Sequence, residues 1–229
     1  MIDHLGIARF FYYRPDMTNQ IDFAKELRTT IWRTKGDRFN SVRRLRRRDR
    51  LSSFSIAAFS VVAIALTILQ KVYAVSSDSM LDNHFTALAI LISMFVLIIS
   101  LLEGTAAYDL KAERLHQNAL DLDALQKNLG HLLSRAADGE TLSSDTLEEI
   151  NRKYEQTIKQ CPENHESIDD LLFQSQYRQS PEFKSACISG FGALRIKVRH
   201  GLAGTLLFLI AWFVIGTLVF LVVGKLIAL

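Results

Sequence analysis

The sequence predicts an all-α membrane protein, with three transmembrane helices and a cytoplasmic helical bundle formed by extensions of those helices. Three long stretches contain no Asp, Glu, Lys or Arg, namely residues 51–70, 83–102 and 201–224. A bilayer core about 30 Å thick requires about 20 helical residues, so each stretch is long enough to span it. The rest of the sequence shows helical periodicity and none of the alternation that is typical of strands.

The composition agrees with this fold class. Hydrophobic residues make up 49% of the chain although 22% of its residues are charged, because the apolar residues are concentrated in the three blocks. The first block begins about 50 residues into the chain, lacks a small-residue cleavage pattern and is followed by a second block. We therefore interpret it as a membrane span and not as a signal peptide.

The distribution of charge predicts the topology. Residues 1–50 contain 13 Lys and Arg, whereas only Lys225 follows the third block. Because basic residues near the ends of spans favour the inside of the membrane, we expect a cytoplasmic N-terminus and an external C-terminus. The predicted segments are a cytoplasmic N-terminal helix (1–50), TM1 (51–70), a short external loop (71–84), TM2 (85–102), a cytoplasmic helical region (103–200) and TM3 (201–224).

A run of arginines, "RRLRRRDR", directly precedes the first span. We interpret it as an orientation signal and an anchor to anionic headgroups, formed by Arg43, Arg44, Arg46, Arg47, Arg48 and Arg50. We do not expect this run to bind nucleic acid, because the headgroups compete for these side chains and no aromatic stacking platform accompanies them. The run belongs to a predicted helix, 19–50, that continues into the first span.

The region between the second and third spans contains several predicted helices. The first carries an a/d seam of Leu115, Asn118, Leu122, Leu125, Leu129 and Leu132, and it ends at Asp138-Gly139. This seam suits an antiparallel partner within the chain or an oligomeric coiled coil, and we favour the first. Asp145-x-x-Glu148 and Ser167-x-x-Asp170 are typical of helix starts, and Gly190 and Gly192 indicate a bend before the third span.

Residue patterns that carry chemistry are missing from the sequence. Cys161 and Cys187 form no CxxC pair and are expected to be free thiols, and no His, Cys, Asp or Glu group has the spacing of metal ligands. No phosphate-binding loop or hydrolase motif occurs. The sequence therefore predicts a protein that is not an enzyme and that needs no cofactor or metal.

Small hydroxyl side chains recur every seven residues in the first two spans and form one narrow stripe on each. The stripes consist of Ser53, Ser60 and Thr67 in the first span and of Thr86, Ser93 and Ser100 in the second. Either they face each other and let the two helices pack closely, or one lines a water path once several subunits assemble. Glu103 at the end of the second span is expected to be a solvated helix-end charge, with a pore-mouth carboxylate as the alternative.

Three segments resemble the SLATT domains, two-helix membrane effectors found beside nucleotide-signalling and SLOG-type genes in bacteria. The matching positions include Trp32, Thr34, Lys35, Arg38, Asn40, Arg44 and Leu45 before the first span, and Tyr108, His116 and Asn118 after the second. A turn with Asn164, His165 and Asp169 is similar to that of the subgroup encoded near reverse transcriptases. From the residues alone we expect His116 and Asn118 to hydrogen-bond within the bundle, and Asn164 and His165 to cap a turn or contact a partner.

The resemblance implies a membrane effector of bacterial antiphage defence, without catalytic residues. Such a protein would form homo-oligomers and permeabilise the inner membrane, triggered by a sensor protein or a nucleotide second messenger from a neighbouring gene. The resemblance covers about residues 25–178, so the third span lies outside the two-helix core. The alternative function is a membrane-anchored scaffold that recruits a soluble partner through its cytoplasmic bundle.

Overall fold

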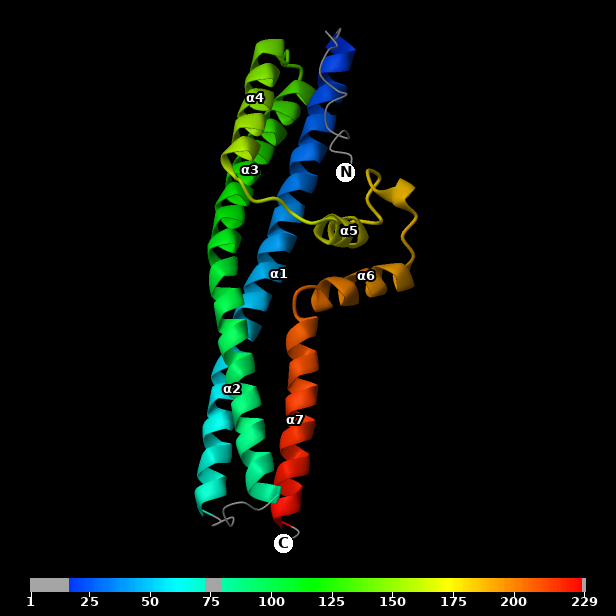
Figure 1. Ribbon diagram of the computed structural model, residues 1–229. Helices are drawn as coiled ribbons and strands as arrows, with labels where there is room; N and C mark the ends of the chain where they lie inside the picture. Colours follow the sequence, from blue (N-terminus) through cyan, green and yellow to red (C-terminus); the bar gives the residue numbers. More distant parts are fainter. Residues whose placement is uncertain (1–16, 73–79, 228–229) are drawn as a thin grey trace, which may run out of the picture.

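The computed structural model describes residues 17–72 and 80–227 of the chain. These residues fold into helices without a strand among them, which confirms the predicted all-α class (Figure 1). The elements are α1 (Met17–Val72), α2 (Met80–Ala106), α3 (Tyr108–Ala137), α4 (Ser144–Gln160), α5 (Ser167–Gln176), the short 3-10 helix η1 (Lys184–Ala186), α6 (Gly190–Leu202) and α7 (Leu206–Ile227).

Three of these helices are long and apolar enough to cross a membrane: the second half of α1, α2 and α7. They pack through one shared core, to which α1 contributes Phe59 and Leu66, α2 contributes Phe85 and Ile92, and α7 contributes Ala211. The indole Nε1 of Trp212 on α7 also donates a hydrogen bond of 2.9 Å to the hydroxyl of Ser55 on α1. The outward faces carry exposed Leu, Ile, Val and Phe side chains, as expected of helices surrounded by lipid.

The first half of α1 lies outside this apolar part and forms a bundle with α3 and α4. Ala24, Leu27 and Ile31 of α1 pack against the seam of α3, including Leu122 and Leu129, and α4 closes the core with Leu147 and Ile150. The seam therefore pairs with helices of the same chain, as we favoured from the sequence. α1 runs from the bundle into the apolar part without a break, which confirms the predicted continuous helix.

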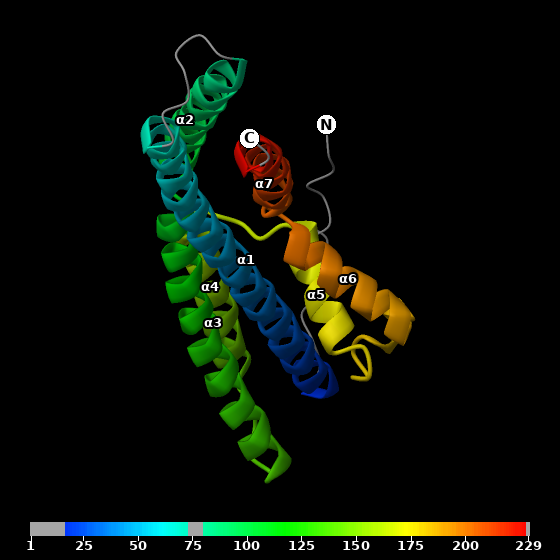
Figure 2. The ribbon, with the colours of Figure 1, turned by 90° about the horizontal axis from the view of Figure 1, so that it is seen from below.

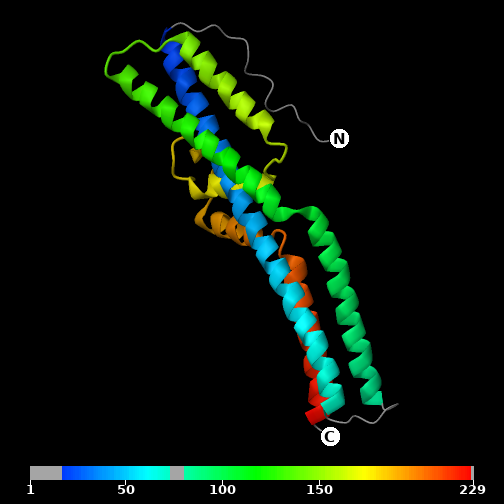
Figure 3. The ribbon, with the colours of Figure 1, turned by 90° about the vertical axis from the view of Figure 1, so that its left-hand side faces the viewer.

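The α2–α3 junction lies at the same level as the arginine run. The two helices meet at Ala107, which has a left-handed φ of 47°, and Figure 3 shows the change of direction there. The guanidinium of Arg48 lies 4.1 Å from the ring centroid of Tyr108 and forms a 2.8 Å ion pair with Glu103. Glu103 is only 10% exposed, so the expectation of a solvated charge was wrong. The paired guanidinium offsets the burial of the carboxylate.

The break before the last helix lies later than the sequence indicated. Gly190 begins α6, which continues to Leu202, and α7 begins at Leu206 and not at residue 201. The turn between them uses Gly204 with φ +79°, where an added Cβ would lie 3.1 Å from Arg48 Cδ. This backbone conformation suits glycine, so the chain turns here, whereas Gly190 and Gly192 are part of a regular helix.

Two further boundaries differ from the sequence interpretation. Of the predicted 71–84 loop, residues 73–79 with Tyr73 lie outside the described residues, and residues 80–84 already belong to α2. The start of α5 is shifted by one residue, because Glu166 is its N-cap and Asp169 completes the capping box, in place of Ser167 and Asp170. Asp138 caps the C-terminus of α3 as predicted, and Ser143 precedes α4.

Candidate functional site

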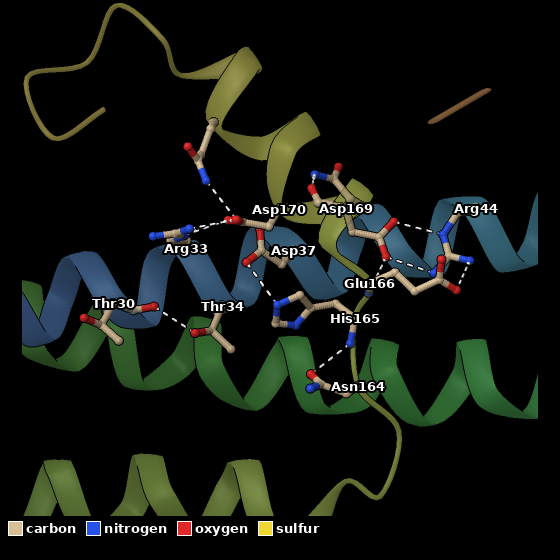
Figure 4. Close-up of polar contacts among 12 residues, drawn as sticks. Thr30, Arg33, Thr34, Asp37, Arg44, Asn164, His165, Glu166, Asp169 and Asp170 are labelled. Carbon is tan, nitrogen blue, oxygen red and sulfur yellow. Dashed lines mark hydrogen bonds and ion pairs between the residues drawn. The ribbon is translucent and has the colours of Figure 1, made fainter. Parts of the chain in front are cut away.

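Charged and polar side chains from four segments meet in the middle of the molecule, on one side of α1. Figure 2 shows that α3 and α4 lie on one side of α1, with α5 and α6 on the other. We name this group the charge cluster. Its members are Arg33, Asp37, Arg38, Asn40 and Arg44 of α1, Asn164, His165 and Glu166 of the turn before α5, Asp169 and Asp170 of α5, and His200 of α6 (most of them are drawn in Figure 4).

Regular helix geometry brings the α1 members together. Arg33, Asp37, Asn40 and Arg44 follow each other at steps of four, three and four residues, so they lie along one face. Phe173 fixes the distance between α5 and this face, because its ring lies against the backbone of Gly36. A Cβ at Gly36 would lie only 2.1 Å from the Phe173 Cδ2 atom, so glycine permits the close approach of the two helices.

Asp169 is the centre of the charge cluster and is fully buried. Its carboxylate accepts hydrogen bonds from Arg44 Nε at 3.1 Å and Nη2 at 2.9 Å, and it contacts His200 Nε2 at 3.0 Å. The backbone N–H of Glu166 donates to the same carboxylate at 2.9 Å, and Asn40 Nδ2 donates to the Asp169 carbonyl at 2.9 Å. One carboxylate thus joins α1, α5 and the last turn of α6.

These contacts determine the charge state of the pair. Burial alone would raise the pKa of Asp169, but hydrogen bonds from His200, Arg44 and the Glu166 backbone outweigh it and bring the pKa to about 2. Burial opposes the charge of Arg44 as well, yet its bonds to Asp169 and Glu166 raise the pKa of its guanidinium. Removing one partner of such a buried pair costs about 3–5 kcal/mol, because the other charge is left without compensation. The contact is therefore a strong tether between α1 and α5.

Asp37 has the opposite charge state, although it lies in the same cluster. Burial raises the pKa of its carboxyl group to about 8, and the nearby charge of Asp170 adds to the shift while Arg33 opposes it. Burial also lowers the pKa of His165, whose Nε2 lies 3.6 Å from Asp37 Oδ2. At neutral pH both groups are therefore mainly uncharged, and their contact is a polar one without net charge.

Asp170 carries the ionised carboxylate next to Asp37. Arg33 binds it with Nε at 2.6 Å and Nη2 at 2.7 Å, and the side-chain amide of Gln174 donates to it at 2.8 Å. The two-pronged guanidinium–carboxylate geometry is the strongest form of such a pair. It forms the second link between α1 and α5.

Arg38 is the unusual member, because its guanidinium is buried without an ion pair to any described residue. Its Nε and Nη1 atoms, like Asp37 Oδ1 and His165 Nδ1, have no hydrogen-bond partner within the described parts of the chain. The positive charge of Arg38 contributes to the low pKa of His165. Arg38 therefore leaves two buried donors without hydrogen-bond partners among the described residues, which is unfavourable for a buried polar group.

Besides Thr34 and Leu45, five positions of the predicted family motif lie in the bundle, outside the charge cluster. Trp32 contacts the rings of Phe173, Tyr177 and Phe183, and Lys35 forms a 2.9 Å ion pair with Asp123 on α3. Asn118 donates to the Thr157 carbonyl of α4, as expected, whereas His116 packs edge-on against Phe39. Tyr108 holds Arg48 at the α2–α3 junction. These residues hold helices together.

The helical twist of α1 places the members of the arginine run on different sides of the helix. Arg44 is buried in the charge cluster, so it is not free to contact headgroups as we expected from the sequence. Arg46 pairs with Glu113 at 2.9 Å, and Arg47 donates to the Gly201 carbonyl at 3.2 Å. Arg43 hydrogen-bonds to Asn40, while Arg47 and Arg50 are exposed. The headgroup anchor stays a prediction for the exposed members of the run.

The hydroxyl stripes lie beside the packed faces of α1 and α2. Ser60, Thr67 and Ser93 donate to carbonyls four residues earlier in their own helices, at 2.8, 3.1 and 2.8 Å. Thr67 and Ser93 line an outward groove of about 550 Å³ between the two helices, and Thr86 accepts from Gln70. Ser53 and Ser100 are exposed. Whether the stripes serve the close packing of the two helices or one of them lines a water path stays a prediction.

Sequence reasoning missed five members of the cluster, namely Arg33, Asp37, Glu166, Asp170 and His200. The four-residue step between Arg33 and Asp37 was a weak signal, but nothing in the sequence pointed to His200. Among the described residues, no group of three or more His, Cys, Asp or Glu side chains is placed to hold a metal ion. Cys161 and Cys187 are free thiols, as predicted. The arrangement links α1, α5 and α6, and the described members of the cluster include no nucleophile paired with a base.

Comparison with known protein families shows which family the chain is similar to. The sequence model of the SMODS and SLOG-associating 2TM effector domain family 5 matches residues 21–222. No curated protein and no solved structure matches the chain. The matched range includes most of α7. The third apolar helix therefore lies within the family match, whereas the sequence resemblance had implied that it lies outside. The reverse-transcriptase-associated subgroup stays a prediction.

Proposed function

The chain belongs to the SMODS and SLOG-associating 2TM effector domain family 5, a family of membrane effectors in conflict systems, and we propose that it permeabilises the inner membrane of a bacterium during antiphage defence. In this proposal several copies assemble, and their apolar helices open a path for ions. A sensor protein or a nucleotide second messenger from a neighbouring gene provides the trigger. No step of this function requires catalysis.

The connection between the charge cluster and the apolar helices is the main structural support for this proposal. α1 carries Asp37 and Arg44 in the cluster and continues without a break into the first apolar stretch. His200 binds Asp169 six residues before α7 begins. A rigid helix transmits a rotation or tilt along its length, so a displacement of α5 would reach two of the three apolar helices.

We propose that the bundle and the charge cluster are cytoplasmic and that the C-terminus is external. The support is the number of basic residues: 13 Lys and Arg in residues 1–50 against Lys225 alone after the third apolar stretch. Three spans place the two ends of the chain on opposite sides. A trigger inside the cell would then meet α3, α4 and α5 directly.

Dye release from liposomes tests the function. Purified full-length protein is reconstituted into phosphatidylethanolamine–phosphatidylglycerol vesicles that contain a self-quenched dye, and the product of the adjacent gene is added. Leakage that requires both proteins and increases steeply with protein per vesicle supports an oligomeric, pore-forming effector. Vesicles that stay tight while the added protein binds stably would contradict the pore and support the alternative, a membrane-anchored scaffold.

A further inference from the structure

α6 presents an apolar face that no part of the described protein covers. Phe191 is 78% exposed, Leu194 57% and Val198 53%, and Leu202 continues the row. Steps of three and four residues place these side chains on one side of the helix. A row of large apolar side chains this exposed, outside the three apolar helices, indicates a surface that binds something.

Basic side chains border this apolar face. Arg195, Lys197 and Arg199 are exposed, and none of them forms an ion pair with any residue in the described ranges. α6 contains no acidic residue. An amphipathic helix with this composition is typical of segments that lie in the interface of a membrane with anionic lipids.

The orientation of α6 in the molecule turns this face away from the bundle. His200 on the opposite side of the helix is 3% exposed and binds Asp169, and α5 packs against α6 from that side. Figure 1 shows α6 lying across the direction of α7, with α5 on one side of it and the length of α7 extending on the other. The apolar face is therefore directed toward the side on which the apolar helices lie.

Contacts with the arginine run place α6 at the end of the apolar part. The Gly201 carbonyl in its last turn accepts a hydrogen bond from Arg47, four residues before the first uncharged stretch begins at Leu51. Gly204 lies against the side chain of Arg48, which in turn pairs with Glu103 at the end of α2. The entry points of all three apolar helices thus lie at one level, and α6 extends sideways from it.

We propose that α6 lies in the bilayer surface, with Phe191, Leu194 and Val198 inserted at the boundary of headgroups and acyl chains and with Arg195, Lys197 and Arg199 bound to anionic lipid phosphates. The occupant of the face is therefore lipid and not a second protein chain. This inference goes beyond membrane permeabilisation, because it makes the effector responsive to the lipid surface. Through His200 and Asp169, a change of depth of α6 reaches the charge cluster.

Fluorescence quenching in vesicles tests the position of α6. The full-length chain carries Cys161→Ser and Cys187→Ser, and Leu194→Cys is labelled with an environment-sensitive fluorophore. Gln156→Cys, an exposed position of α4 in the bundle, provides the matched control. We expect a nitroxide near the lipid headgroup to quench the Leu194 label more than a nitroxide at the end of the acyl chain, and aqueous iodide to quench it poorly. The Gln156 label should respond to iodide alone.

Two results would overturn the proposal. Iodide quenching at Leu194 equal to that at Gln156 would show that water covers the face. Protection of the Leu194 label from both iodide and lipid nitroxides would show that protein covers it, as in an interface between two copies.

A charge-neutralised variant tests the lipid phosphates separately. The test variant combines Arg195→Gln, Lys197→Gln and Arg199→Gln. In the unsubstituted protein the headgroup nitroxide should quench the Leu194 label more in phosphatidylglycerol vesicles than in phosphatidylcholine vesicles. In the variant the ratio of quenching between the two vesicle types should fall, by up to about fivefold for each charge removed. An unchanged preference would overturn the assignment of these residues to anionic headgroups.

Discussion

Asp37 and Asp169 lie in the same cluster and are both buried, yet they have opposite charge states at neutral pH. Asp169 receives hydrogen bonds from a guanidinium, an imidazole and a backbone amide, so its charge is stabilised. Asp37 contacts a histidine that is itself mainly neutral, and the ionised Asp170 is nearby. The partners of a buried carboxylate, more than its burial, therefore decide whether it is ionised.

We expect the substitution Asp37→Asn to stabilise the protein at neutral pH. The pKa of Asp37 is about 8 in the folded protein and has its ordinary value of 3.8 when unfolded. Stability from this group is thus fully present below about pH 4 and decreases as the pH rises toward 8. An uncharged Asn avoids this loss of unfolding free energy. At about 1.4 kcal/mol per pKa unit, the loss at pH 7 amounts to as much as about 4 kcal/mol.

Thermal unfolding in detergent across this pH range measures the effect. The gain in melting temperature for Asp37→Asn should disappear as the pH falls toward 4. Asp22→Asn provides the control, because Asp22 is exposed and forms only a 3.4 Å pair with Lys25. A gain that is independent of pH would contradict the raised pKa of Asp37.

At the scale of elements, the contact between α1 and α5 depends on Gly36, because glycine has no side chain. Phe173 lies against Gly36 and is held there by Trp32, Tyr177 and Phe183. The rings cannot move independently, because each contacts at least two of the others. A methyl group at residue 36 would therefore have to displace α5 itself, and with it Asp169 and Asp170.

Two glycine substitutions separate this packing effect from helix propensity. Gly36→Ala should destabilise the protein by about 1–3 kcal/mol, because overpacking outweighs the gain from alanine. Gly130→Ala, within α3, should stabilise it by about 0.5–1 kcal/mol, because its nearest neighbour, Arg28 Nε, is 3.7 Å from the added Cβ. Denaturant unfolding of both variants measures the difference, and equal effects would show that Phe173 does not hold α5 in place.

At the scale of the whole molecule, the bundle and the apolar helices share α1 as a common rigid element. The charge cluster lies close to the level where the apolar helices begin, and both α1 and α6 leave it in that direction. A trigger bound to the bundle can thus act on the membrane part without a hinged linker. This geometry supports gating, the feature that distinguishes the proposed effector from a scaffold.

The groove between α1 and α2 provides a test of the proposed path for ions. Ser93→Leu should reduce dye or ion leakage in the reconstituted system at least tenfold, because it replaces a hydroxyl in the groove by an apolar side chain. Thr217→Leu on α7 is the matched control, since Thr217 is exposed and also bonds to its own helix, at 2.8 Å from the Phe213 carbonyl. Unchanged leakage in folded Ser93→Leu protein would contradict a path along this stripe.

Local patterns in the sequence determined the helices of this protein. Uncharged stretches of about 20 residues predicted the three apolar helices, and the α3 seam predicted an antiparallel partner, which is α1 of the same chain. The end of α3 at Asp138 followed from the Asp-Gly pair. These features depend on neighbours within a few turns, so composition and periodicity are sufficient to predict them.

The tertiary structure alone decided which charges are buried. In the run of arginines every member looks alike, yet Arg44 lies inside the charge cluster while Arg50 is exposed. The difference arises because α5 and His200, more than 120 residues later in the chain, cover one face of α1. Periodicity describes how side chains are arranged around one helix, but the burial of a charge depends on which distant segment supplies its partner.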